Sequence, residues 1–194
     1  MTPLLRARLA SQNRNKLEEL RAALPEWEIE PLAADDWPAG DGESYEENAR
    51  LKAHFGRAHA RPGEWVLGED SGIECAALDG GPGLHSARWA PSVDQADALL
   101  ERLAGEHDRR ARMVTALVAL SPGGGEFTGL GVLEGTIAPA KRGNTGFGYD
   151  PIFVPTGGEQ TVAELDEAWK NEHSHRARAA KALAISVAAG RGGS

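Results

Sequence analysis

The sequence predicts an α/β fold with a mixed β-sheet flanked by helices. Three observations support it: an apolar run, a polar loop and an amphipathic helix open the chain, two apolar runs around a glycine-rich connection follow in the middle, and helical patterns close it. Strand–helix units of the parallel type combined with a hairpin give a sheet whose strands run in both directions.

The first unit predicts a strand at 5–10 and a helix at 15–24, with leucines on one face of the helix. The loop between them, SQNRNK at 11–16, brings free backbone amides and a lysine to a helix N-terminus, which favours a bound anion. It lacks the glycines and the Lys-Ser/Thr pair of a Walker A motif. A plain helix cap by Ser11 or Asn13 is the alternative, and both interpretations stay open here.

A short second strand is predicted at 27–31, followed by a loop at 32–42 that is rich in Ala, Asp, Gly and Pro. Ser44 and Glu47 have the spacing of a capping box, so we expect a helix from there to about residue 60. On this helix Lys52 faces either a cleft or the solvent, and the sequence does not decide between them.

The most unusual stretch is GEDSGIECAALDGGPGLHSAR at 68–88. An apolar strand at 65–67 is expected to end in Glu69, Asp70 and Ser71, ahead of a glycine-rich loop. Acids at such a sheet edge are typical of polar chemistry in α/β folds, and a metal ion or a lysine would offset their charge. The alternative is a strand that ends in a solvated acidic turn.

The middle of the chain predicts a helix at 93–103, a charged turn at 106–112, and a hairpin of strands at 113–120 and 126–133 around SPGGG. The segment RGNTGFGYDPIFVP at 142–155 then sets two glycines around Phe147. Exposed aromatic rings there would suit stacking on a nucleobase, whereas a tight turn would bury them in the core.

Two C-terminal helices are expected, one at 163–170 and one that Ser174 caps and that ends at Gly190. Lys170, His175 and Arg176 lie at their junction. Cations at a helix N-terminus oppose the helix dipole, which points to an anionic or carbonyl-rich ligand.

The composition limits the class of protein. The 194 residues carry a net charge of -8, with 41% hydrophobic and 26% charged residues, as in ordinary globular proteins long enough for a substantial core. This charge disfavours nucleic acid and membrane surfaces as partners but allows a small polyanion. No long apolar span or signal segment is visible, so cytoplasmic residence is expected. The single cysteine, Cys75, is expected to be a buried structural thiol.

Four segments, SQNRNKLEEL, GEDSGIECAALDGGPGLHSAR, GNTGFGYDPIF and KNEHSHR, together closely resemble the Ham1/RdgB family of noncanonical purine nucleoside triphosphate pyrophosphatases, also called inosine triphosphate pyrophosphatases. The resemblance covers nearly the whole chain, in the family's order. It implies one domain over 1–194, with an elongated two-lobed fold around a central active-site cleft, and a homodimer. It also implies Mg²⁺-dependent hydrolysis of ITP, dITP or XTP to the monophosphate and pyrophosphate, which would cleanse the nucleotide pool.

The resemblance also implies roles for individual residues. The catalytic residues it implies are Asp70, Glu69 and Lys52: Asp70 matches the base and Mg²⁺ ligand, Glu69 is a second acid beside it, and Lys52 is a lysine that faces the phosphates. The triphosphate loop comprises Ser11, Gln12, Asn13, Arg14, Asn15 and Lys16. The other substrate contacts are Ser71, Phe147, Gly148, Tyr149, Asp150, Lys170, His175 and Arg176.

One position departs from the family pattern. Gly40 stands where relatives commonly carry a metal-binding glutamate, so Asp41, Glu43 or water would have to complete the metal shell. Three rival functions remain at this point: a broader Maf-like nucleotide pyrophosphatase, an enzyme that cleaves the terminal phosphate, and a non-catalytic nucleotide-binding module. The sequence lacks the phosphate loop expected of the second, and the third gives no reason for acids beside the phosphate site.

Overall fold

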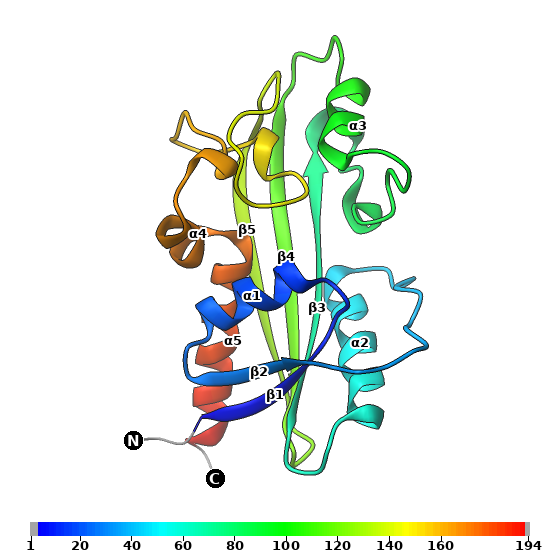
Figure 1. Cartoon of the computed structure of the whole chain (residues 1–194), viewed down its shortest axis with the longest axis vertical. Coiled ribbons are helices and arrows are strands. Elements are labelled where there is room, and N and C mark those ends of the chain that lie inside the picture. Colours follow the sequence, from blue (N-terminus) through cyan, green and yellow to red (C-terminus); the bar gives the residue numbers. More distant parts are fainter. Residues whose placement is uncertain (1–3, 193–194) are drawn as a thin grey trace. The chain divides into compact units, whose positions relative to one another are not determined.

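The computed structural model describes residues 4–192 and contains one six-stranded sheet (Figure 1). The strands lie in the order β2-β1-β3-β4-β5-β6. β1 runs parallel to β2 and β3, whereas β5 and β6 are antiparallel, so the predicted α/β class and mixed sheet are confirmed. The strands are β1 (Leu5–Ala10), β2 (Trp27–Pro31), β3 (Trp65–Cys75), β4 (Arg110–Leu120), β5 (Glu126–Ile137) and β6 (Phe153–Pro155).

Five α-helices accompany the sheet in the described part of the chain. They are α1 (Arg14–Ala23), α2 (Tyr45–His59), α3 (Gln95–Arg102), α4 (Glu167–His173) and α5 (His175–Arg191). Short 3₁₀ turns lie at Ala76–Leu78, Gly83–His85, Asp150–Ile152 and Val162–Glu164.

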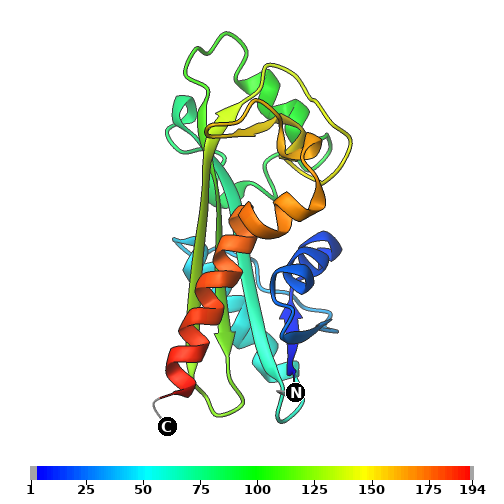
Figure 2. The ribbon, with the colours of Figure 1, turned by 90° about the vertical axis from the view of Figure 1, so that its left-hand side faces the viewer.

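The chain forms two compact units, and each is described by itself. The first comprises residues 4–70, 115–131 and 175–192. Within it, alternate strand residues enter two separate cores: Leu67 and Leu117 pack with α1 and α5, whereas Val66 and Val118 pack with α2. Because successive side chains of a strand point to opposite faces, helices cover both faces of this part of the sheet, and Figure 2 shows α5 in front of the strands and α2 behind them.

Glycines let two of these helices approach the sheet closely. A Cβ atom on Gly68 would lie 1.9 Å from the carbonyl oxygen of Ala49 in α2, and one on Gly131 would lie 2.0 Å from the carbonyl oxygen of His175 in α5. No larger residue fits either backbone contact.

The second unit comprises residues 71–114 and 132–174 and has its own core. Ile73, Phe153 and Leu99 are fully buried in it. Cys75 also lies in this core, where burial raises the pKa of its thiol to about 11, in agreement with a structural role.

Several predicted boundaries were wrong, each for a local reason. β3 does not end at the acids but continues to Cys75, because Ile73 and Cys75 alternate into the core. The expected charged turn at 106–112 is partly strand, since β4 begins at Arg110. The expected helix at 163–170 is a 3₁₀ turn followed by α4, which starts where the Asp166 side chain accepts a hydrogen bond from the Trp169 amide at 2.7 Å.

Candidate active site

The predicted site residues fall into two groups, one in each compact unit. In the first unit, the two acids on β3 project to opposite faces of the sheet. Asp70 shares the face of Gly68 and contacts α2, whereas Glu69 faces α1 and α5. The structure therefore contradicts the expectation that both carboxylates lie side by side at one sheet edge, because adjacent strand residues alternate.

Asp70 lies between two side chains of α2. Its Oδ1 accepts a hydrogen bond from Lys52 Nζ at 2.6 Å, and its Oδ2 accepts one from Asn48 Nδ2 at 3.2 Å. The Asp70 side chain keeps 14% of its surface exposed, so solvent and small ligands reach it. Lys52 also donates to the carbonyl of Glu69 at 3.0 Å, which rules out the solvated helix face as its position.

Glu69 is fully buried and its carboxylate is held by two cations. Its Oε2 lies 2.6 Å from Lys16 Nζ, and its Oε1 accepts hydrogen bonds from Arg176 at 3.2 Å. Burial alone would raise the pKa of Glu69, but the positive charges of Lys16, Arg176 and Lys52 hold it well below its usual range. Glu69 therefore fixes the side chains of Lys16 and Arg176, and its catalytic role remains a prediction.

Arg176, near the start of α5, is 2% exposed and also forms an ion pair with Glu19 of α1. Two carboxylates thus offset the unfavourable position of this cation at a helix N-terminus, and a ligand is not needed to explain it. Sequence reasoning missed Glu19. No local pattern could have indicated it, because its partner Arg176 lies 157 positions away.

The loop before α1 is a helix cap in the present structure. The Asn13 side chain accepts hydrogen bonds from the amides of Asn15 and Lys16, and Ser11 Oγ accepts one from the Asn13 amide at 3.2 Å. A pocket of about 360 Å³ lies beside this loop, lined by 11–14, Leu17 and the segment 31–35 with Trp37. Gln12, Asn13, Arg14 and Asn15 are exposed, and their role in phosphate binding remains a prediction.

His175 also belongs to the first unit, at the first position of α5. Its Nδ1 lies 2.6 Å from the hydroxyl of Thr115, a fully buried residue of β4. This contact fixes the orientation of the imidazole ring. Nothing in the sequence indicated Thr115, because the two residues lie 60 positions apart.

In the second unit, Asp150 organises the predicted base-binding segment. Its Oδ2 accepts hydrogen bonds from the Phe147 amide at 3.0 Å and from Lys170 Nζ at 2.8 Å. The same Nζ lies 5.6 Å from the centre of the half-buried Phe147 ring, within the range of a cation–π interaction. Gly146 has a φ of +74°, and a Cβ there would lie 2.1 Å from Asp150 Oδ2, so this turn requires glycine.

Tyr149 does not present an exposed ring. It is 8% exposed within the core of the second unit, its hydroxyl donates to the Ser86 carbonyl at 3.0 Å, and burial raises its pKa. Of the two interpretations left open for this segment, burial in the core holds for Tyr149, whereas Phe147 and Gly148 remain partly accessible. Ser71, the first residue of the second unit, is also partly accessible.

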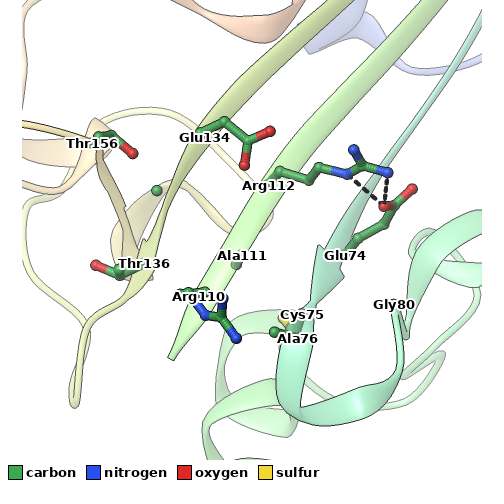
Figure 3. Close-up of a pocket in the computed structure, with 11 residues that line it drawn as sticks. Glu74, Cys75, Ala76, Gly80, Arg110, Ala111, Arg112, Glu134, Thr136 and Thr156 are labelled. Atoms are coloured by element: carbon green, nitrogen blue, oxygen red, sulfur yellow. Dashed lines mark hydrogen bonds and ion pairs between the residues drawn. The ribbon is translucent and has the colours of Figure 1, made fainter. Parts of the chain in front are cut away.

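A separate pocket of about 420 Å³ lies in the second unit, lined by residues of β3, β4 and β5 (Figure 3). Arg112 extends across it toward Glu74 and forms an ion pair of 2.7 Å. None of the predicted site residues line this pocket.

The described residues contain no group of three or more His, Cys, Asp or Glu side chains placed to hold a metal ion. Asp41 and Glu43 are exposed and do not form such a group with Asp70. The Gly42 amide between them donates to Asn48 Oδ1 at 2.8 Å, so this loop is tied to a residue that contacts Asp70.

Comparison with known proteins places the chain in one family. The model of the Ham1 family matches residues 7–185. A dITP/XTP pyrophosphatase of Gloeobacter violaceus is 42% identical over 178 residues, covering 90% of both chains, and one of Symbiobacterium thermophilum is 45% identical over 178 residues, covering 88% of this chain and 89% of its own.

Solved structures agree with this result. The Ham1 protein of Staphylococcus aureus superposes with a TM-score of 0.81 at 32% identity, covering 95% of this chain and 99% of its own. A nucleoside-triphosphatase / dITP/XTP pyrophosphatase of Mycobacterium abscessus gives a TM-score of 0.70 at 36% identity, covering 92% of this chain and 97% of its own.

Proposed function

The chain belongs to the Ham1 family, and we propose that it hydrolyses deaminated purine nucleoside triphosphates (ITP, dITP, XTP) to the monophosphate and pyrophosphate. The observation that carries this proposal is the partly exposed carboxylate of Asp70, held between Lys52 and Asn48 on a buried strand. Relatives of about 40% identity, named dITP/XTP pyrophosphatases, support the choice of substrate.

The reaction needs a base, a positioned water and charge neutralisation. In the proposed mechanism Asp70 takes a proton from a water molecule whose oxygen forms a bond to the α-phosphorus. The bond from that phosphorus to the bridging oxygen breaks, and pyrophosphate leaves. In this proposal Lys52, which contacts Asp70, and Lys16, whose Nζ lies 2.6 Å from Glu69, neutralise phosphate oxygens.

We also propose that the reaction requires a divalent cation, specifically Mg²⁺. The hard carboxylate oxygens of Asp70, which is partly exposed, suit this ion. When bound, Mg²⁺ would offset the negative charge of the phosphates. Asp70 is the residue that would hold it.

Base recognition is proposed for the second unit. Phe147 offers a half-exposed ring for stacking, and Lys170 offers hydrogen-bond donors to the 6-keto oxygen of hypoxanthine or xanthine. The 6-amino group of adenine would face a donor instead. Arg176 and His175 are kept as proposed substrate contacts, although Glu69, Glu19 and Thr115 occupy part of their hydrogen-bonding capacity.

Three broader expectations from the sequence are retained as proposals. They are a single catalytic domain with a central cleft, a homodimer, and a cytoplasmic role in cleansing the nucleotide pool. Within residues 4–192, no helix combines the length and the apolar character that a membrane crossing requires. Light scattering coupled to gel filtration of the full chain tests the dimer.

Product analysis tests the proposed function. The chain is incubated with dITP and Mg²⁺, and the phosphate product is identified by ³¹P NMR. Pyrophosphate together with dIMP is expected, with a kcat/KM for dITP about a hundredfold or more above those for dATP and dGTP. Orthophosphate would indicate cleavage of the terminal phosphate, comparable rates on all three would indicate a broad Maf-like enzyme, and binding without turnover would indicate a non-catalytic module.

A further inference from the structure

Asn48 is a buried side chain of α2 that uses both ends of its amide group. It is 1% exposed, its Oδ1 accepts from the Gly42 amide at 2.8 Å, and its Nδ2 donates to Asp70 Oδ2 at 3.2 Å. An amide buried in this way is stable only while its partners stay in place. Asn48 therefore connects the loop before α2 to the carboxylate on β3.

The loop side of this connection is closely fitted. A Cβ atom on Gly42 would lie 2.9 Å from Asn48 Oδ1 and 3.0 Å from the Glu47 side chain, so the loop backbone passes directly over the amide. The neighbouring Glu43 amide donates to Glu47 Oε2 at 2.7 Å, which gives a second tie between the same loop and α2.

The carboxylate side is defined by two donors that approach different oxygens. Lys52 and Asn48 lie one helical turn apart on α2, and they contact Oδ1 and Oδ2 of Asp70 respectively. Two donors fix the rotation of the carboxylate, whereas Lys52 alone would let it turn about its last bond. The base must accept a proton from a water molecule that is aligned with the α-phosphorus, so it depends on that orientation.

We propose that Asn48 is a positioning residue for the reaction: it holds the Asp70 carboxylate in its productive orientation and ties that carboxylate to the loop at 40–43. The proposal rests on the proposed pyrophosphatase function. Asn48 acts through Asp70 and contributes no reacting atom of its own.

Two substitutions test it. Asn48→Asp keeps the size of the side chain and an acceptor for the Gly42 amide but removes the donor to Asp70; Asn48→Ala removes the donor without adding a charge. For both we expect kcat for pyrophosphate release from dITP to fall about a hundredfold, with KM within about threefold of wild type. Gln160→Glu, an amide-to-acid change on an exposed loop, serves as the matched control and should keep full activity.

Two further measurements separate positioning from a loss of folded protein. Calorimetric titration with dITP in EDTA gives the number of dITP molecules bound per chain. This number should stay near one in both variants. A double-mutant cycle of Asn48→Asp and Asp70→Asn measures the free energy of unfolding without nucleotide. The two changes should be coupled, because in the double variant an amide donor at position 70 again faces a carboxylate acceptor at position 48.

The outcomes are distinct. A kcat within about threefold of wild type in both variants, a loss explained by the non-binding fraction, or an absence of coupling in the cycle would overturn the role of Asn48. Failure of the wild-type chain to release pyrophosphate would instead overturn the proposed function, and the cycle would still report whether the Asn48–Asp70 hydrogen bond exists.

Discussion

Glu69 and Asp70 are chemically similar neighbours whose surroundings give them different tasks. The strand turns one carboxylate into a buried cluster with Lys16 and Arg176 and leaves the other partly exposed beside Lys52. A base must exchange protons with water, and only Asp70 of the two has the access to do so. Glu69 instead forms buried ion pairs with Lys16 and Arg176, and its own catalytic role stays a prediction.

Replacing Asp70 tests this division directly. Asp70→Asn should lower kcat for dITP at least about a thousandfold, because it removes the proton acceptor, while the dissociation constant for dITP stays within about fivefold. Pyrophosphate release and calorimetric titration measure the two quantities.

The matched control is Asp79→Asn, the same chemical change at an exposed turn with a φ of 49°, a conformation that asparagine tolerates well. It should keep wild-type rates. Near-normal turnover by Asp70→Asn would remove Asp70 from the role of base and leave the site without a proposed acceptor.

The contrast between these residues also shows what the sequence can and cannot predict about the site. The acids, the lysine on α2 and the loop before α1 are visible as local patterns, because the residues that make up each pattern lie within one strand, one helix or one loop. The partners of Glu69 are not, since Lys16 and Arg176 lie 53 and 107 positions away. The contact between Asn48 and Asp70 was hidden for the same reason, since these residues lie 22 positions apart.

Strands and helices with strong local signals were predicted well. β1 and β2 have the predicted bounds, and α1 begins one residue before its expected start because Asn13 caps it. β3 was predicted too short, since its acids and glycine resemble the end of a strand. Gly68 is in fact a contact point, where the backbone of β3 meets the backbone of α2 at Ala49 and Ala53.

This contact makes a prediction about α2 as a unit. Gly68→Ala would place a Cβ 1.9 Å from the Ala49 carbonyl oxygen and 2.7 Å from the Ala53 amide, so the helix must move away from the sheet. We expect a loss of about 1–3 kcal/mol in the free energy of unfolding. A drop in kcat should accompany it, because Lys52 and Asn48 move with α2. Urea unfolding and the dITP assay measure these effects.

Gly123→Ala is the control for this change. Gly123 lies in the exposed turn between β4 and β5, its φ is not positive, and a Cβ there meets nothing within 4 Å. The free energy of unfolding of Gly123→Ala should stay within about 0.5 kcal/mol of that of the wild type. Equal stability of Gly68→Ala and Gly123→Ala would show that α2 does not pack against β3 as closely as described.

The chain as a whole divides its predicted tasks between its two compact units. Asp70, Lys52 and the loop before α1 belong to the first, whereas Phe147, Asp150 and Lys170 belong to the second. Each group has its own core and its own internal hydrogen bonds. Chemistry on the phosphates and choice of the base are therefore expected to respond to different substitutions.

Phe147→Ala tests that separation. Loss of base stacking costs about 1–3 kcal/mol, which corresponds to a rise of roughly 5- to 150-fold in KM for dITP, while kcat should stay within about fivefold because Asp70 and Lys52 are untouched. This is the reverse of the pattern expected for Asp70→Asn. Steady-state kinetics measure both, and thermal unfolding checks that the variant is folded. A fall in kcat with unchanged KM would place Phe147 in the catalytic step and contradict the assignment of base recognition to the second unit.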